Sequence, residues 1–277
     1  MENLEFTTLS AAATSVLGTP DPMAKVRLGR AIAVMWHGGS IGDVGSTLAP
    51  NRPARPMRPI LLLPRDLPKR KVSRDPTGRI ALLHALAHIE LNAIDLAWDM
   101  IARFACADLP RAFFDDWVGV AAEESGHFAL LDQRLSALGA EYGDLPAHDG
   151  LWAAAEATAH DLLARLAVVP LVLEARGLDV TPAMITRLRV VDDGLSADIL
   201  DIIYRDEIGH VAVGKRWFDH VAATRGLQPV ATWQDLVRRY FKGGVKPPFN
   251  IAAREAAGFP AAFYGPLGDE FLARKAS

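Results

Sequence analysis

The chain has 277 residues; half of them are hydrophobic, 23% are charged, and the formal net charge is −3. These values are typical of a globular protein with a sizeable core. No window has eighteen uninterrupted apolar residues, so we expect no membrane span. The single cysteine, Cys106, excludes an intramolecular disulfide framework and a thiolate metal cluster. The N-terminus lacks the basic start and the apolar run of a signal peptide, so we expect a cytoplasmic protein.

Residues 1–76 are predicted to contain two parts. The first is a short helix near residues 22–35, and the second is a basic, proline-rich arm packed on the bundle. Residues 51–79 contain nine Lys and Arg against two Asp, with prolines throughout. The favoured interpretation is a solvated arm wrapped over the domain. The alternative is an arm that binds RNA through residues 52–79. The basic residues that RNA would contact are Arg52, Arg55, Arg58, Lys69, Arg70 and Lys71.

Residues 77–226 are predicted to form a bundle of four long helices. Apolar residues recur there at helical spacing, and no segment alternates as a strand would. Residues 227–277 are predicted to be a helical C-terminal extension. The expected fold class is therefore all-α: a four-helix bundle with an N-terminal arm and additional C-terminal helices, one structural domain overall. The four long helices are expected over about residues 77–106, 111–138, 150–176 and 195–224.

Local signals indicate where these helices begin and end. Asp75 and Pro76 supply an N-cap and a first-turn proline for the first helix. Pro170 should kink the third helix, which is expected to end before Gly177. Thr181–Pro182 is expected to begin another helix.

Each of the four helices carries a glutamate on its otherwise apolar stripe, and two of them add a histidine three residues later. A buried carboxylate is very unfavourable unless it is paired, protonated or bound to a metal. A spacing of three residues puts the glutamate and the histidine on one face of the helix. The candidate metal ligands are Glu90, Glu124, His127, Glu174, Glu207 and His210.

One Glu from each of two helices, with Glu-x-x-His from each of the other two, is the ligand set of di-iron and di-manganese carboxylate bundles. Here 34 residues separate Glu90 from Glu124 and 33 separate Glu174 from Glu207, as expected of two helical hairpins related by a pseudo-twofold axis. Oxygen and imidazole ligands without thiolate argue against structural zinc. We therefore predict two iron ions, with manganese as the alternative metal, in preference to a fortuitous set of hydrogen-bonded buried acids.

Four further residues are candidates for a layer around the ligands. Asp206 and Glu123 each precede a ligand glutamate, and a carboxylate there would accept the free ring N–H of a ligand histidine. For Glu123 a solvent-facing charge is an equal alternative. Tyr204 lies one turn before Glu207, where a core tyrosine is favoured over a redox-active or hydrogen-bonding neighbour of the metals. Arg176 is expected to pair with a nearby acid.

Two other features accompany the ligands. Gly126 and Gly209 stand immediately before the two ligand histidines, although glycine costs a helix about 1 kcal/mol relative to alanine. Close approach of another helix, or room beside the metals, would explain them. His84 and His88 lie away from the stripe of Glu90, so we expect them to make hydrogen bonds between helices.

Four long stretches carry a likeness to a known family. They are residues 84–99 (HALAHIELNAIDLAWD), 122–152 (beginning AEESGHFALLDQ), 164–182 (ARLAVVPLVLEARGLDVTP) and 206–218 (DEIGHVAVGKRWF). They closely resemble the ferritin-like family catalogued as domain of unknown function 455, and the likeness extends to the basic arm and the KPPFN turn. The resemblance implies a ferritin-like fold and a di-metal site, and all six candidate ligands match its expected positions.

A more distant likeness concerns the stretch EARGLD around Glu174. It is similar to the third-helix motif of the di-iron tRNA hydroxylase that acts on a hypermodified adenosine beside the anticodon. That motif continues with a cysteine and an acidic–basic pair, whereas this chain is expected to turn away at Gly177. We therefore do not expect this chain to share the substrate of the tRNA hydroxylase.

The predicted function is an O2-activating oxidoreductase of the mono-oxygenase type, which needs O2, an unknown substrate and an external electron donor. One alternative is a ferritin-like iron-handling or peroxide-scavenging protein. Another is a metal-stapled scaffold that binds RNA. The sequence does not determine the oligomeric state, but exposed apolar stripes on the bundle would be compatible with a homodimer.

Overall fold

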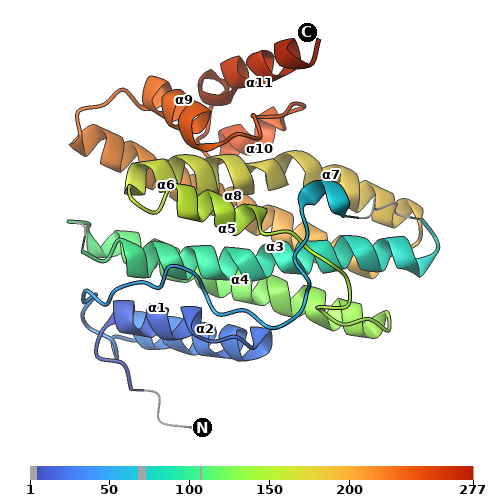
Figure 1. Cartoon of the computed structure of the whole chain (residues 1–277), viewed down its shortest axis with the longest axis horizontal. Helices are drawn as coiled ribbons and strands as arrows, with labels where there is room; N and C mark the ends of the chain where they lie inside the picture. Colours follow the sequence, from blue (N-terminus) through green and yellow to red (C-terminus); the bar gives the residue numbers. More distant parts are fainter. Residues whose placement is uncertain (1–4, 68–72, 107, 277) are drawn as a thin grey trace. The chain divides into compact units, whose positions relative to one another are not determined.

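The computed structural model describes residues 5–67, 73–106 and 108–276, and it contains helices and loops without a strand in those ranges. The all-α prediction is confirmed. Internal contacts divide the chain into two compact units, Met1–Trp152 and Ala153–Ser277, which are described separately. Helix α5 (Gly150–Ala157) spans the boundary in the sequence (Figure 1). The division predicted at residues 76 and 226 rests on composition and stays a prediction.

The first unit is built around two long helices, α3 (Pro76–Arg103) and α4 (Arg111–Ala137), which pack along each other. Their short connection is typical of antiparallel neighbours. Helix α1 (Leu9–Leu17) packs on α3, and α2 (Pro22–His37) packs on α4. A short 3₁₀ turn, η1 (Pro64–Asp66), lies in the arm. The largest fully buried apolar side chains of this unit are Trp36, Trp98, Trp117, Trp152, Phe113, Phe114 and Phe128.

Helix α3 begins where its sequence predicts and lies deep in the first unit. A side-chain oxygen of Asp75 accepts a hydrogen bond from the backbone N–H of Thr77 at 2.7 Å, and Pro76 occupies the first turn. The helix is long and apolar enough to cross a membrane, but 78% of its apolar window is buried inside the fold. Such burial is typical of the core helix of a soluble protein. A cytoplasmic location stays a prediction.

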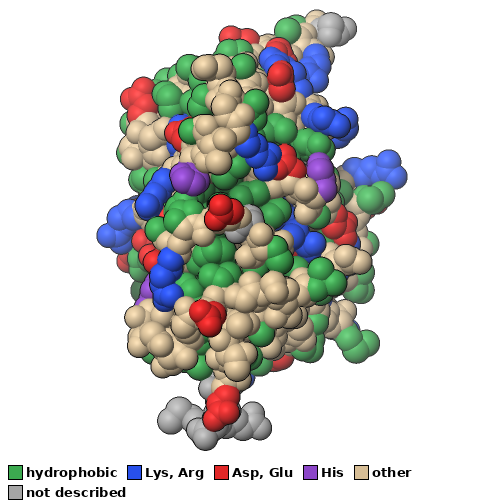
Figure 2. All heavy atoms as spheres, turned by 90° about the vertical axis from the view of Figure 1, so that its left-hand side faces the viewer, with side chains coloured by type: hydrophobic (Ala, Val, Ile, Leu, Met, Phe, Trp, Pro, Cys, Tyr) green, Lys and Arg blue, Asp and Glu red, His purple; other side chains and the backbone are tan. Residues whose placement is uncertain are grey.

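The basic arm is held on the first unit by two of its arginines. Arg55 Nε lies 2.9 Å from a carboxylate oxygen of the buried Asp95, and Arg52 forms an ion pair with Asp149. These two arginines are among the predicted RNA contacts, and RNA binding stays a prediction. Arg58 is exposed, whereas residues 69–71 lie outside the described part of the chain. Basic and acidic side chains are interspersed on the face shown in Figure 2.

The second unit contains a long helical segment made of three consecutive parts. Helix α6 (Leu162–Val168), the π-helical segment η2 (Val169–Glu174) and α7 (Ala175–Val190) follow one another without a loop and pack along α8 (Gly194–Thr224). Helix α9 (Pro229–Tyr240) packs on α6, and α10 (Ile251–Ala256) packs on α7 and α8. The C-terminal helix α11 (Ala261–Ala276) packs on α9.

The third helix predicted over residues 150–176 begins at the expected residue, but it is interrupted after Ala157 and does not end before Gly177. Helix α5 ends at Ala157, and a new helix begins after Asp161, whose side chain accepts a hydrogen bond from the backbone of Leu163 at 3.2 Å. At the other end, α7 continues through Gly177 and Pro182. The expected turn at Gly177, which set the chain apart from the tRNA hydroxylase motif, is therefore not found.

Long-range contacts explain why α7 continues. Burial of Leu178 and Leu188 outweighs the cost of Gly177, which is about 1 kcal/mol. Pro182 lacks an N–H group, so the carbonyl of Leu178 loses its donor within the helix. The side-chain amide of Asn250 donates to that carbonyl at 3.1 Å, and the Asn250 side chain also caps α10. A residue 68 positions further along the chain thus compensates for the proline.

Substituting Asn250→Ala is expected to lower the free energy of unfolding by about 1–3 kcal/mol, because the Leu178 carbonyl then lacks a donor. Urea unfolding followed by circular dichroism measures the change. In a Pro182→Ala background the backbone N–H is restored, so the same substitution should cost less. The exposed Asn51→Ala is the matched control. Equal costs of Asn250→Ala with and without Pro182 would contradict the compensation.

Candidate metal centre

Three of the predicted ligands lie together in the first unit. Glu90 comes from α3, and Glu124 and His127 come from adjacent turns of α4. His127 Nδ1 lies 3.3 Å from Glu90 Oε2 and 3.3 Å from Glu124 Oε2. The three residues are only 3%, 0% and 2% exposed, respectively. One ligand atom from each lies within 4.8 Å of the others, so this buried group is able to hold a metal ion.

The electrostatics of this group call for a positive charge between the carboxylates. Burial and the neighbouring charge of Glu124 raise the pKa of Glu90 to about 8. Burial lowers the pKa of His127, but the hydrogen bonds and charges of Glu124 and Glu90 outweigh it and raise the pKa to about 11. An imidazolium supplies one such charge, and a divalent cation bound to the same oxygens would supply another.

The other three predicted ligands lie in the second unit. Glu207 and His210 are buried on α8, with His210 Nδ1 3.9 Å from Glu207 Oε2. Glu174 is half-buried and ends η2, which packs along α8. At Pro170, where the sequence predicts a kink, the structure has this π-helical segment. Because a π-turn shifts the register of the residues that follow it, and such turns are frequent at functional sites, the direction of Glu174 differs from that in a straight α-helix.

A buried ion pair fixes the helix that follows Glu174. Arg254 of α10 contacts both carboxylate oxygens of Asp179 of α7, at 2.9 and 2.7 Å, and both side chains are buried. The same guanidinium donates to the carbonyl of Ala175 at 3.3 Å, next to Glu174. It lies over the rings of Phe249, Phe259 and Tyr264. The C-terminal extension therefore holds α7 at the residue that adjoins a predicted ligand.

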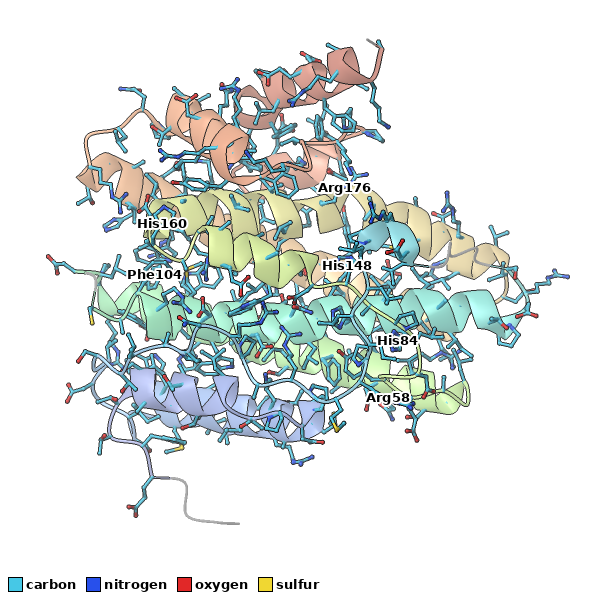
Figure 3. The ribbon with its side chains drawn as sticks, in the orientation of Figure 1. Arg58, His84, Phe104, His148, His160 and Arg176 are labelled. Atoms are coloured by element: carbon cyan, nitrogen blue, oxygen red, sulfur yellow. The ribbon has the colours of Figure 1, made fainter. Side chains whose placement is uncertain are left out.

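Two of the four residues predicted around the ligands belong to this network. The Tyr204 hydroxyl accepts a hydrogen bond from Asn250 at 2.9 Å. Arg176 lies 3.4 Å from Asp179 and donates to the Lys246 carbonyl at 2.7 Å (Figure 3).

The other two residues predicted around the ligands are more accessible. Glu123 is exposed and Asp206 is half-buried. For all four residues, a role beside a metal stays a prediction.

The two histidines assigned to hydrogen bonding both contact the loop after α4. His88 Nδ1 lies 2.8 Å from the Tyr142 hydroxyl. The backbone N–H of Gly143 donates to His84 Nε2 at 2.9 Å (Figure 3 labels His84). Their partners lie in a loop and not on another helix, so the expected hydrogen bonds exist but the expected location of the partners was wrong.

Several buried charges were missed by sequence reasoning. Asp95 on α3 forms a buried ion pair with Lys25 of α2 in addition to its pair with Arg55; burial lowers the pKa of Lys25, although Asp95 opposes this. Asp179 and Arg254 were also missed. The signal for Asp95 was its position in an otherwise apolar helical stretch, whereas the signal for Arg254 lies only in the fold.

The glycines beside the histidines have an open surrounding. A Cβ added at Gly126 or Gly209 would meet no atom within 4 Å, and Gly209 is exposed. The explanation that another helix approaches closely at these two glycines is therefore wrong. It occurs instead at Gly214 of α8, where an added Cβ would lie 2.3 Å from Cβ of Pro170.

Gly126→Ala and Gly209→Ala are each expected to raise the free energy of unfolding by about 0.5–1 kcal/mol, because alanine orders a helix at lower entropic cost. Gly214→Ala should lower it by about 1–3 kcal/mol, because the new methyl group overlaps Pro170. Thermal and denaturant unfolding of the three variants distinguishes the two classes. A destabilising Gly209→Ala would show that the glycine is needed for packing after all.

Comparison with known proteins extends over both units. A family model described as "Protein of unknown function (DUF455)" matches residues 18–265. A protein of Haemophilus influenzae described as "Uncharacterized protein" is 46% identical over 218 residues, which cover 76% of this chain and 74% of that protein. No solved structure matches the chain.

Proposed function

The chain belongs to the family described as "Protein of unknown function (DUF455)", and we propose that it is a di-iron carboxylate protein that activates O2 as an oxidoreductase. Manganese is the alternative metal. The proposal includes a ferritin-like bundle formed by α3, α4, the segment α6–η2–α7 and α8, in which the two half-sets of ligands serve one di-metal centre. It is supported by the presence of the same half-set, a Glu with a Glu-x-x-His pair, in each unit.

The observation that carries the proposal is the buried group of Glu90, Glu124 and His127. Its oxygen and nitrogen atoms come from two adjacent helices and lie within 4.8 Å of one another. This donor set suits iron or manganese, and the two carboxylates require a compensating positive charge. The residues present therefore fit the metal that the ligand pattern implies.

In the proposed site the chain's residues have distinct tasks. The glutamates Glu90, Glu124, Glu174 and Glu207 would bind the metals through oxygen, and His127 and His210 would bind through nitrogen. Two iron ions would supply the electron transfer to O2. One oxygen atom would enter a C–H bond of the substrate and the other would leave as water, with two electrons supplied by an external donor and two protons taken up. Burial keeps bulk water away from Glu90, Glu124 and His127, which would strengthen their electrostatic contacts with a metal.

The alternatives use parts of the same structure. A ferritin-like iron-handling or peroxide-scavenging protein would use the same ligands but would treat the metal as substrate. A metal-stapled scaffold that binds RNA would need the basic arm. The ion pairs of Arg52 with Asp149 and of Arg55 with Asp95 weigh against the use of those two arginines for RNA.

Protein purified without chelator is expected to hold about two iron ions per chain. Glu124→Ala and Glu207→Ala should each lower this to about one ion or fewer, because each removes a ligand carboxylate. Mass spectrometry of the metal content measures the loss, and Glu255→Ala, exposed on α10, is the control that should keep the metal. Adding O2 to the reduced protein should oxidise the iron, which absorption spectroscopy detects.

The outcomes separate the hypotheses. Metal-free protein, or equal metal content in all variants, contradicts the metal site. Iron-loaded protein that is inert to O2 contradicts the oxidoreductase while leaving the metal site in place. Uptake of iron far beyond two ions per chain, in a large shell seen by size-exclusion chromatography, supports iron handling instead.

A further inference from the structure

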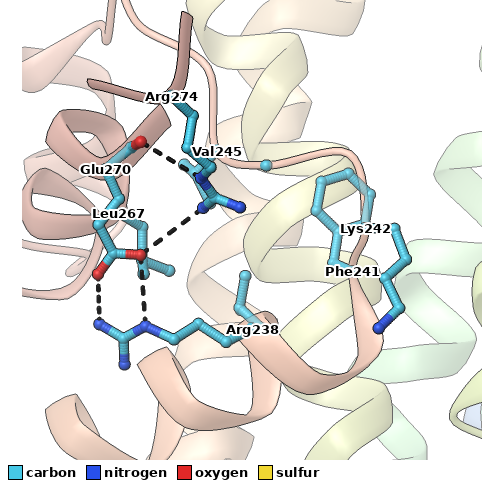
Figure 4. Close-up of a pocket in the computed structure, with 9 residues that line it drawn as sticks. Arg238, Phe241, Lys242, Val245, Leu267, Glu270 and Arg274 are labelled. Carbon is cyan, nitrogen blue, oxygen red and sulfur yellow. Dashed lines mark hydrogen bonds and ion pairs between the residues drawn. The ribbon is translucent and has the colours of Figure 1, made fainter. Parts of the chain in front are cut away.

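The second unit contains a pocket outside its half-set of ligands. It lies among α9, the loop after α9 and α11, and its volume is about 380 Å³. This volume is within the range of small-molecule sites. Figure 4 shows Arg238 of α9, Lys242 of the loop, and Glu270 and Arg274 of α11 around it.

Positive charge dominates the lining of this pocket. Three cationic side chains and one carboxylate leave a net charge of +2, whereas the whole chain carries −3. Glu270 holds both arginines at the rim: Arg238 Nη2 lies 2.7 Å from Glu270 Oε1, and Arg274 Nη2 lies 3.7 Å from Glu270 Oε2 (Figure 4). Lys242 is exposed on the opposite side of the lining. Glu270 thus holds the two guanidinium groups in place but neutralises only one of the three positive charges. The remaining positive charge is available to an anionic ligand.

The floor of the pocket is apolar and has a fixed shape. Val237 and Leu267 are buried there at 2% and 3% exposure. Gly244 adopts φ +67° and lies so close to α11 that an added Cβ would be 2.7 Å from the Phe271 ring. Only glycine accepts this conformation and this approach readily. The loop is therefore held against α11, with Phe241 beside the opening as an aromatic wall.

We propose that this pocket binds a small phosphate monoester whose organic part rests on the apolar floor and against Phe241. A phosphate monoester carries a charge of about −1.5 to −2 at neutral pH, which matches the net charge of the lining. Guanidinium groups bind phosphate oxygens through paired hydrogen bonds, and lysine adds a mobile point charge. A neutral molecule would leave the cations unmatched, and a bare anion would leave the apolar floor unused.

Isothermal titration calorimetry of the full chain with adenosine 5′-monophosphate, adenosine and inorganic phosphate tests this assignment. Adenosine 5′-monophosphate should bind, inorganic phosphate should bind at least about tenfold more weakly, and adenosine should show no binding. Raising the salt concentration should weaken the binding of the monophosphate, because the contacts are charged and accessible.

Lys242→Gln and Arg274→Gln are expected to weaken adenosine 5′-monophosphate binding by at least about tenfold. Arg239→Gln is the matched control: Arg239 is an exposed neighbour on α9, its guanidinium lies over Tyr240, and it does not line the pocket. All three substitutions are at exposed residues, and circular dichroism checks that the fold is kept. Undetectable binding of the monophosphate, equal binding of inorganic phosphate, or equal losses in all three variants would overturn the proposal. Loss of metal in the Glu207→Ala protein would not affect it.

Discussion

Two carboxylates buried against one imidazole, between α3 and α4, set the condition that the first unit has to satisfy. Glu90 and Glu124 are separated from water by the side chains around them, and burial makes their like charges costly. The raised pKa of Glu90 reflects this cost, and the pKa of His127 is raised because the two glutamates accept its hydrogen bonds and attract its positive charge, which outweighs burial. The long α3–α4 contact and its aromatic core stabilise the unit sufficiently to keep the charges inside. The group of Glu90, Glu124 and His127 is thus held inside a unit whose other buried carboxylates are paired with basic side chains.

In the second unit, contacts between residues far apart in the sequence hold the segment that follows Glu174. Its predicted ligand Glu174 ends a π-helical segment, and the helix beyond it contains a proline, so local sequence alone would not keep this segment straight or fix its direction. Arg254 and Asn250, both from the C-terminal part of the chain, contact Asp179 and the Leu178 carbonyl and hold the helix there. The C-terminal extension therefore serves the geometry of the predicted ligand and is more than an appendage.

How much the sequence predicts follows from the range of the interactions involved. Periodicity and caps are local, so the start of α3 at Asp75 and the burial of Glu124 and Glu207 could be predicted. The course of α7 through Pro182 depends on Asn250, which is remote in the sequence, so rules based on neighbouring residues end the helix too early. The π-turn before Glu174 has the same origin: Pro170 signals an irregularity, but the close contact with Gly214 on another helix is visible only in the fold.

Two pairs of buried carboxylates in this protein differ in the groups they face, and the difference favours the proposed metal site. Asp95 and Asp179 each face an arginine at 2.9 and 2.7 Å, and an arginine keeps its charge at any physiological pH. Glu90 and Glu124 instead face the imidazole of His127, which either carries a proton or offers a lone pair to a metal. Asp95 and Asp179 are thus neutralised by groups that stay charged, and Asp95 also pairs with Lys25. An imidazole between two buried glutamates provides a positive charge that a cation can replace, and the second unit repeats that choice with Glu207 and His210.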